Sequence, residues 1–486
     1  MDKTRREFLK TGAKTLALVT AAERLEAWRT PRTVLGASDR VRLGIIGLRG
    51  RGQEHIQRFG TLPNVEIAAL CDIDDSVLRE HLQVVQKMGF RPKTYTDVRK
   101  LLEDKSIDAV SIATPNHWHT LMSIWACQAG KDVYVEKPCS HNLWEGRQLV
   151  RAAAKYGRMV QHGTQSRSIP SVMQAVKQMQ DGLLGDVYMA RGLCYKWRDT
   201  IGRTPVSEVP AGVDYDLWTG PAPYQPFTKN HFHYNWHWFW NYGNGDIGNQ
   251  GVHEVDIARW GLGLGFPNKI SAIGGHFVFE DDQQTPNTLS CAFQYDLPDG
   301  KRKMIEFEVR HWMTNHEAEI GARANADARP KTAQAAAVPN CPHGGCGAQD
   351  LYPSYGGSGH ENTVGDIFYG SKGYLAVDSV LGGYRTWMGR EQKAGPSMPH
   401  RPEDQDHFGN FIACVISRKQ EELRAPITEG HISAGLVHLA NASYRLGRTL
   451  TFDPETQLVK DDDEANYLLR DGDRGYRAPF VVPEEV

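Results

Sequence analysis

Short apolar runs alternate with helical segments through residues 41–156, and no other feature of the chain constrains its fold as strongly. The apolar runs span residues 41–47, 65–71, 109–113 and 132–135. Segments with helical periodicity span residues 53–59, 76–88, 98–103, 117–128 and 143–156. Strands that alternate with helices at short spacing predict a parallel sheet with right-handed crossovers. We therefore expect an α/β, Rossmann-type doubly wound domain over residues 36–160 that binds NAD(P).

The pattern changes after residue 186, where loops rich in Gly, Pro and aromatic residues become long. Strand-like runs span residues 187–195, 269–279, 288–295, 303–309 and 374–377. Helical patterns return at residues 408–418 and 431–444, and residues 322–349 are an Ala/Pro/Gly-rich insertion without periodicity. We expect a C-terminal α+β domain over residues 161–486, with a large, open, mainly antiparallel sheet. We assign substrate binding and oligomerisation to this domain.

The N-terminal segment, residues 1–35, is interpreted as a targeting signal and linker. Paired arginines, Arg5 and Arg6, precede Phe-Leu-Lys and a weakly apolar stretch at residues 11–22. This pattern resembles a twin-arginine export signal, which is an address read by a receptor. A basic amphipathic helix is the alternative, and the segment is compatible with cleavage or with retention as an anchor. We expect passage through the twin-arginine export machinery to the periplasm or another extracytoplasmic compartment.

The composition indicates a globular protein with a small-molecule partner. Hydrophobic residues make up 40% and charged residues 23%, and the formal net charge is -2. The absence of a basic excess argues against a nucleic-acid partner. Of the eight cysteines, Cys341 and Cys346 lie close together, and a disulfide, free thiols and a metal site all stay open for them. The other six are expected to be small core residues, namely Cys71, Cys127, Cys139, Cys194, Cys291 and Cys414.

A glycine-rich loop follows the first predicted strand and opens the first predicted helix. The dinucleotide fingerprint is Gly-x-Gly-x-x-Gly. When the chain is aligned on Gly47 and Gly52, the middle glycine is replaced by Arg49, although Gly50 stands next to it. The middle glycine normally lets the backbone approach the pyrophosphate, so this loop alone is a weakened motif.

Asp72 strengthens the interpretation. It ends the second predicted strand, twenty residues after Gly52. A carboxylate at this position accepts hydrogen bonds from the adenosine ribose and disfavours a 2′-phosphate. We therefore expect NAD in preference to NADP. Arg49 or Arg51 pairing with a phosphate would favour NADP, which stays as the alternative.

Two further segments follow predicted strands. Thr114-Pro115-Asn116-His117-Trp118-His119 follows the strand that ends at Ala113, and Glu136-Lys137-Pro138 follows the strand that ends at Val135. Open α/β sheets bind ligands at the carboxyl ends of their strands. We expect cofactor contacts from Thr114, Pro115, Asn116, His119, Glu136 and Lys137.

Together with the segment from Gly245 to Asp256, these motifs resemble the Gfo/Idh/MocA family, which includes glucose–fructose oxidoreductase and inositol dehydrogenases. The resemblance extends from about residue 40 to near the C-terminus. It implies an NAD-dependent oxidoreductase that transfers a hydride between a nicotinamide and a secondary hydroxyl of a sugar or polyol. It also implies a homo-oligomer, in which the open sheet packs against another subunit.

The resemblance assigns roles to three positions. Lys137 of the Glu-Lys-Pro turn orients the reacting hydroxyl near the nicotinamide, and His253 resembles the general base or acid. Many members carry an aspartate four residues before that histidine, where this chain has Asn249. Asp246 and Asp256 are the candidate replacements. Without the resemblance, Lys137 would be an ordinary turn lysine and His253 an ordinary histidine at a helix start.

The chemistry of alcohol oxidation agrees with these roles. The reaction removes a hydride from carbon and a proton from oxygen. Histidine titrates near neutrality and takes the proton, while a nearby lysine polarises the oxygen as charge develops on it. The cofactor accepts the hydride.

Aromatic residues and histidines dominate the expected substrate side. Tyr195 ends a predicted strand, and residues 231–240 are dense in His, Phe, Tyr and Trp. Aromatic faces with polar tips suit the mixed surface of a sugar. We expect substrate contacts from Lys137, Tyr195, Trp236, His237, Asn249 and His253. A half-buried strand or a subunit contact is the alternative for residues 231–240, and we expect no metal at the three histidines there.

Export would place the enzyme where free NAD is scarce, so we expect NAD to be held tightly and recycled within the site. Two other functions stay open. One is a redox-neutral glycosidase or lyase that cleaves a glycoside through a transient keto-sugar. The other is a non-catalytic binding protein, which would follow if Asn249 marks lost chemistry.

Overall fold

The computed structural model describes residues 40–321, 362–379, 383–399, 406–470 and 475–486. The expected export signal, together with Cys341 and Cys346, lies outside the described residues. All six other cysteines are buried and free, as predicted. Within the described ranges, no helix has the length and apolarity needed to span a membrane.

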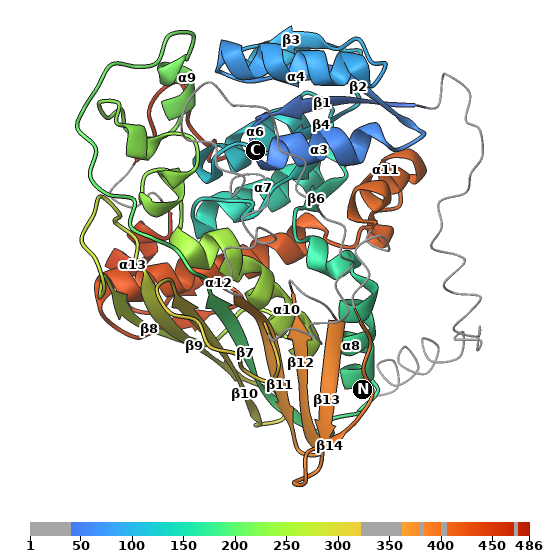
Figure 1. Cartoon of the computed structure of the whole chain (residues 1–486), viewed down its shortest axis with the longest axis vertical. Coiled ribbons are helices and arrows are strands. Elements are labelled where there is room, and N and C mark those ends of the chain that lie inside the picture. The colour runs from blue at the N-terminus through green and yellow to red at the C-terminus, as the bar shows by residue number, and fades with distance from the viewer. Residues whose placement is uncertain (1–39, 322–361, 380–382, 400–405, 471–474) are drawn as a thin grey trace, which may run out of the picture. The chain divides into compact units, whose positions relative to one another are not determined.

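Six parallel strands form the N-terminal sheet, in the order β3-β2-β1-β4-β5-β6 (Figure 1). The strands are β1 (Val41–Ile46), β2 (Val65–Cys71), β3 (Lys93–Tyr95), β4 (Ala109–Ile112), β5 (Asp132–Val135) and β6 (Val160–His162). The connecting helices are α3 (Arg51–Gly60), α4 (Asp75–Lys87), α5 (Val98–Glu103), α6 (Asn116–Gln128) and α7 (Leu143–Tyr156). The strand order reverses between β1 and β4, which is the switch point where doubly wound sheets bind ligands. The predicted architecture is confirmed.

The second sheet has ten strands in the order β14-β13-β12-β11-β7-β10-β9-β8-β15-β16. Only β7 and β10 pair in parallel among these strands, so the sheet is mainly antiparallel, as predicted. The predicted strands are found as β7 (Val187–Tyr195), β8 (Lys269–Gly275), β9 (Thr288–Asp296), β10 (Arg302–Arg310) and β12 (Gly373–Asp378). The others are β11 (Thr363–Gly370), β13 (Gly383–Met388), β14 (Lys393–Ala394), β15 (Leu450–Asp453) and β16 (Leu458–Val459).

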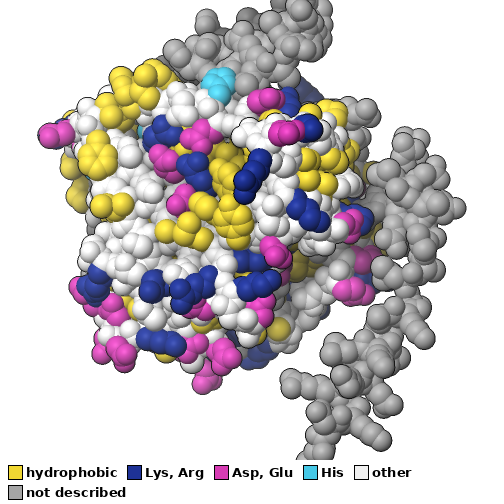
Figure 2. All heavy atoms as spheres, turned by 90° about the horizontal axis from the view of Figure 1, so that it is seen from below, with side chains coloured by type: hydrophobic (Ala, Val, Ile, Leu, Met, Phe, Trp, Pro, Cys, Tyr) yellow, Lys and Arg dark blue, Asp and Glu magenta, His cyan; other side chains and the backbone are white. Residues whose placement is uncertain are grey.

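Helices cover one face of this sheet, the face directed toward the nucleotide domain in Figure 1. They are α8 (Pro170–Gln180), α10 (Val252–Leu262) and α12 (Ile427–Leu446). Helix α12 contacts both β8 and α7 and therefore lies between the two sheets. Figure 2 views the molecule from below, where the ten-stranded sheet lies, and shows apolar side chains interspersed with basic and acidic ones.

The chain returns to the nucleotide domain near its C-terminus. Helix α11 (His407–Ser417) buries Phe411 in the same apolar cluster as Leu43 of β1. The predicted domain boundary at residue 160 falls inside β6, because Val160 pairs with Val133 of β5. A boundary drawn along the sequence misses α11, because its partners are more than three hundred residues away.

Candidate active site

The glycine loop has the backbone geometry that a dinucleotide requires. Gly47 has φ 77°, and Gly50 has φ 49° immediately before α3, where no side chain caps the helix. A Cβ on Gly52 would lie 1.9 Å from the carbonyl oxygen of Gly47. The N-terminus of α3, which no side chain of the described residues caps, therefore directs backbone N–H groups and a positive dipole end toward the switch point, and both favour a pyrophosphate. Arg49 in place of the middle glycine leaves this geometry intact.

Asp72 is half-buried at the end of β2 and faces the loop. Its carboxylate accepts hydrogen bonds from the backbone N–H of Leu48 at 2.9 Å and of Asp74 at 3.0 Å. Two backbone bonds leave lone pairs for ribose hydroxyls, because a carboxylate has about four acceptor positions. Arg49 pairs with Asp74 at 3.2 Å. The loop and Asp72 together fit NAD.

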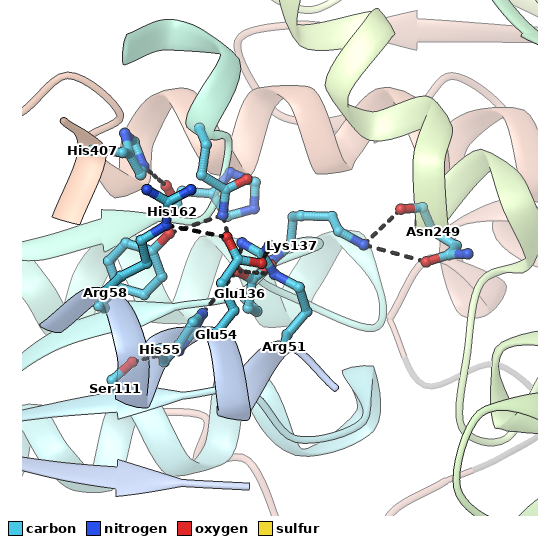
Figure 3. Close-up of polar contacts among 12 residues, drawn as sticks. Arg51, Glu54, His55, Arg58, Ser111, Glu136, Lys137, His162, Asn249 and His407 are labelled. Carbon is cyan, nitrogen blue, oxygen red and sulfur yellow. Dashed lines mark hydrogen bonds and ion pairs between the residues drawn. The ribbon is translucent and has the colours of Figure 1, made fainter. Parts of the chain in front are cut away.

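Glu136 lies at the centre of a cluster of polar side chains (Figure 3). Its Oε1 accepts hydrogen bonds from Arg51 Nη2 at 3.0 Å and from Gln165 Nε2 at 2.9 Å, and lies 3.1 Å from His55 Nε2. Burial favours the neutral acid, but the Arg51 guanidinium and His55 hold the pKa of Glu136 well below its usual range. Glu136 is buried and Arg51 is partly exposed, and their ion pair supports the loop. His55 and Gln165 lack a sequence signal, since each belongs to a helix far from the turn.

The side chains of His119 and Asn116, for which cofactor contacts were predicted, make hydrogen bonds within the protein. His119 Nδ1 lies 2.6 Å from the carbonyl oxygen of Pro138, and its Nε2 lies 2.7 Å from that of Thr114. Asn116 donates to the side-chain oxygen of Asn244 at 3.0 Å. Both side chains are buried and tie the strand ends together. Thr114 and Pro115 remain half-buried at the strand edge.

Lys137 reaches across from β5 to the other domain (Figure 3). Its Nζ donates to the backbone carbonyl oxygen of Asn249 at 2.6 Å and lies 3.4 Å from the Asn249 side-chain oxygen. Burial lowers the pKa of Lys137 to about 8, assisted by the positive charge of Arg51 and opposed by Glu136. A substantial fraction of this amine is therefore neutral near pH 8.

His253 lies in the first turn of α10, and its Nδ1 is buried and has no hydrogen-bond partner among the described residues. Burial and the positive charge of Lys137 lower the pKa of His253 to about 3. The imidazole is therefore neutral at neutral pH. A neutral imidazole offers one acceptor nitrogen and one donor nitrogen to a ligand.

Asn249 and its neighbours form a single π-helical turn, η5 (Ile247–Gly251), immediately before α10. Such turns are rare and frequent at functional sites. The Asn249 amide donates to Asp246 Oδ1 at 3.2 Å and to the Tyr234 hydroxyl at 3.3 Å. Asp256, the other candidate replacement, pairs instead with Arg167 at 2.7 Å. Of the two candidate carboxylates, Asp246 is therefore the one that contacts Asn249.

Asp246 is buried and strongly paired. Its carboxylate accepts from Arg198 Nε at 2.8 Å, and its Oδ2 lies 2.8 Å from His311 Nε2. Burial opposes ionisation, but Arg198 and His311 hold the pKa of Asp246 well below its usual range. Arg198 and His311 come from strand ends that show no motif in the sequence.

The aromatic segment supplies part of the site. His237 Nδ1 lies 2.5 Å from the carbonyl oxygen of Tyr234, and the Trp236 ring stacks on His237 with centroids 3.6 Å apart. Burial and the charge of Lys137 lower the pKa of His237 to about 3, which places this histidine in the field of Lys137. No group of His, Cys, Asp and Glu in the described part of the chain is arranged to hold a metal ion.

Tyr195 does not belong to the site, contrary to the prediction. Its hydroxyl donates to Glu308 at 2.8 Å, and its ring packs with Leu193 and Ile367 on the outer face of the ten-stranded sheet. Cys194, the preceding residue, belongs to the core on the helix-covered face. Successive side chains of a strand point to opposite faces, so a shift of one residue decides between site and outer surface.

Two family models match the chain. An oxidoreductase family model described as an NAD-binding Rossmann fold matches residues 41–164. The model of the C-terminal alpha/beta domain of the same family matches residues 170–275 and 384–480. Together the two models cover more than half of the chain.

Curated relatives match a shorter part. A Glycosyl hydrolase family 109 protein of Shewanella pealeana is 34% identical over 207 residues, which cover 38% of this chain and 45% of that protein. An Alpha-N-acetylgalactosaminidase of Shewanella oneidensis is 32% identical over 204 residues, covering 38% of this chain and 44% of the relative. The chain thus spans less than half the length of these relatives.

Solved structures share the fold over most of the chain. Aldose-aldose oxidoreductase from Caulobacter crescentus, complexed with glycerol, has a TM-score of 0.57 at 17% identity, covering 85% of this chain and 100% of its own. The WlbA dehydrogenase from Bordetella pertussis, in complex with NADH and UDP-GlcNAcA, also has a TM-score of 0.57 at 17% identity, covering 85% and 99%. With its glycine loop, Asp72 and matched C-terminal domain, this chain belongs to the Gfo/Idh/MocA family of NAD-binding oxidoreductases.

Proposed function

We propose that the protein oxidises a secondary hydroxyl of a sugar or polyol by hydride transfer to tightly bound NAD. One observation carries this proposal: the Lys137 amine, with a pKa of about 8, lies at the carboxyl end of β5, bonds to the Asn249 carbonyl oxygen at 2.6 Å, and lowers the pKa of His253 through its charge. An amine that is partly neutral near neutral pH suits proton transfer, whereas an ordinary lysine would stay charged.

The residues divide the work of the reaction between them. The loop from Gly47 to Gly52 and the carboxylate of Asp72 hold NAD, which supplies the hydride acceptor. The unpartnered Nδ1 of His253 is available to hydrogen-bond the reacting hydroxyl. Lys137 accepts the hydroxyl proton as the C–H hydrogen leaves with its electron pair and the C–O bond becomes a carbonyl. We assign the proton to Lys137 because an imidazolium at position 253 would be strongly disfavoured, as its pKa of about 3 indicates.

The remaining part of the proposal concerns location and assembly. We propose export through the paired arginines Arg5 and Arg6, with NAD carried inside the folded protein. Cell fractionation tests this: replacing both arginines by lysine retains the protein in the cytoplasm, and unchanged secretion would contradict it. We also propose a homo-oligomer formed through the outer face of the ten-stranded sheet, where Tyr374 stacks on Trp387 with centroids 4.7 Å apart. Light scattering of the purified protein measures its mass.

A second function is supported by the names of the curated relatives. Glycosyl hydrolase family 109 proteins match the chain at 33 to 34% identity. Transient oxidation of a glycoside acidifies the neighbouring C–H bond. A base would remove this proton, a C=C bond would form, and the aglycone would leave as its alcohol. In a glycosidase water would then add to the double bond, and bound NADH would return the hydride to the keto group, so that no net oxidation occurs. The same Lys137 and bound NAD serve this redox-neutral route, so the site is compatible with both reactions. A non-catalytic role is disfavoured, because Asn249 still contacts Lys137.

Absorbance spectroscopy of the protein as isolated distinguishes these routes. Free sugars, polyols and aryl glycosides are added in turn, in light and in heavy water. Lasting reduction of the bound nicotinamide with formation of a keto-sugar supports the dehydrogenase. Glycoside cleavage without lasting reduction, and with deuterium incorporated next to the oxidised carbon, supports the redox-neutral route. Protein that neither contains nor binds a nicotinamide contradicts both.

A further inference from the structure

Lys196 is a second amine in the site to which the proposed reaction gives no role. It directly follows β7, two residues after Cys194 and two before Arg198. The Sγ of Cys194 lies 3.7 Å from Asp246, and Arg198 pairs with the same carboxylate, so both flanking side chains face the site. The charge of Lys196 lowers the pKa values of both Lys137 and Asp246. Lys196 therefore shares the electrostatic environment of the reacting groups.

The only described contact of the Lys196 ammonium is with a neutral amide. Its Nζ donates to Gln250 Oε1 at 2.5 Å, and no carboxylate of the described residues forms a salt bridge with it. Gln250 in turn donates to Glu254 at 3.1 Å. Burial raises the pKa of Glu254 to about 8, so this carboxyl is largely neutral at neutral pH and does not balance the charge.

Two other positive charges of the site are paired with carboxylates, whereas Lys137 donates to the backbone carbonyl oxygen of Asn249. Arg198 is neutralised by Asp246 at 2.8 Å, and Arg51 by Glu136 at 3.0 Å. Asn249 adds no negative charge at the position where an aspartate would. The half-buried Lys196 is thus a positive charge beside the reacting centre that forms no salt bridge with a carboxylate of the described residues.

An ammonium that forms no salt bridge favours acidic substrates over neutral ones. A neutral sugar bound next to Lys196 would displace water from the ammonium without supplying a negative charge, and this desolvation would weaken binding. A carboxylate on the sugar would form a charge-assisted hydrogen bond and neutralise the cluster. The π-helical turn points Asn249 at Lys137 and Gln250 at Lys196, so one short element holds both amines at once.

We propose that Lys196 is a specificity-determining residue that pairs with an acidic group of the substrate, so that the substrate is a carboxylate-bearing sugar such as a hexuronic acid or its glycoside. This inference rests on the proposed sugar oxidation. It adds the chemical class of the substrate.

Matched substrate pairs test the inference. Glucuronate and glucose, and galacturonate and galactose, are compared through kcat/KM for reduction of the bound nicotinamide. The same comparison is made for Lys196→Gln, for Lys196→Arg, and for Lys269→Gln at an exposed position in β8 of the same sheet. We expect the wild type to prefer the acids, and Lys196→Gln to lower the acid-to-neutral ratio by about tenfold or more, the loss typical of one hydrogen bond to a charged group. Lys196→Arg should retain the preference and Lys269→Gln should leave it unchanged.

Several outcomes overturn the inference. A wild type that uses neutral sugars as well as acids, or a Lys196→Gln variant that keeps the ratio, would contradict it. If only neutral sugars reduce the bound nicotinamide, the role of Lys196 is contradicted but the proposed oxidation is supported. If no sugar of either kind reduces the cofactor, the proposed oxidation is contradicted. Calorimetric titration with glucuronate then tests separately whether Lys196 binds a carboxylate. Binding by the wild type that is lost in Lys196→Gln supports the pairing, and no binding by the wild type rejects it.

Discussion

The Nζ of Lys137 donates a hydrogen bond of 2.6 Å to the backbone carbonyl oxygen of Asn249, 112 residues away in the sequence. This bond joins the carboxyl end of β5 to the π-helical turn before α10, and so connects the nucleotide domain to the substrate domain at the reacting centre. The partner is a backbone carbonyl, which any residue at position 249 would provide. The position of Lys137 is therefore compatible with asparagine in place of the usual aspartate.

The pH dependence of activity reports on Lys137. Its amine accepts a proton only when it is neutral, and its pKa is about 8. We expect kcat/KM to rise about tenfold per pH unit below this value and to level off above it. Lys137→Arg keeps the positive charge but cannot lose its proton, so it should lower kcat by about a hundredfold or more. A pH profile that is flat below pH 8, or an active Lys137→Arg variant, would reject the assignment.

Asn249→Asp should move this profile to higher pH. A carboxylate would replace an amide oxygen that lies 3.4 Å from Lys137 Nζ, and a nearby negative charge raises the pKa of an amine. The same change puts a second carboxylate beside Asp246 in place of a donated hydrogen bond. We expect a loss of about 1–3 kcal/mol in the free energy of unfolding, measured with urea. Asn249→Ala is the control, because it keeps the backbone carbonyl and should leave the midpoint of the profile in place.

Gly52→Ala should abolish binding of NAD. The added Cβ would lie 1.9 Å from the carbonyl oxygen of Gly47, a contact that requires the backbone of the loop to shift. Gly50→Ala offers a matched comparison, because its Cβ meets nothing within 4 Å and only its φ of 49° is unfavourable. That strain costs about 1–2 kcal/mol. The nicotinamide released on denaturing each purified variant measures occupancy, and equal occupancy in both variants would contradict the geometry.

Glu254→Gln should make stability less dependent on pH. Burial raises the pKa of Glu254 from 4.5 to about 8, so between these values the folded protein holds a proton that the unfolded chain releases. The free energy of unfolding of the wild type therefore falls as pH rises through this window. Glutamine does not titrate, so the stability of the variant relative to the wild type should increase over the same window. Urea unfolding at several pH values measures this difference. A constant difference would mean that Glu254 is already ionised.

The sequence was sufficient for the local elements and for the motifs at strand ends. Helix α7 and strand β7 agree with the prediction at both ends, because their apolar periodicity and their bounding Asn, Gly and Asp residues are local signals. Seven strands were not predicted, namely β3, β6, β11, β13, β14, β15 and β16. All of these except β11 are only two to six residues long, and their neighbours in the sheet stabilise them. β11 has eight residues.

The site also contains residues that the sequence predicted and residues that only the tertiary structure revealed. Gly47, Gly52, Asp72 and Lys137 were proposed from the sequence, because turns and strand ends in a doubly wound sheet place such residues at one edge. His253 was proposed from the family resemblance. Only the tertiary structure decided that Tyr195 faces outward while Lys196 faces the site. It also decided that both ring nitrogens of His119 lie next to backbone carbonyl oxygens and that Asp246 accepts a hydrogen bond from the Asn249 amide. These outcomes depend on strand register and on the packing of segments far apart in the sequence, such as Lys137 and Asn249, 112 residues apart, or Arg198 and Asp246, 48 residues apart. A local pattern carries no information about either, because register and long-range packing are set by the whole core.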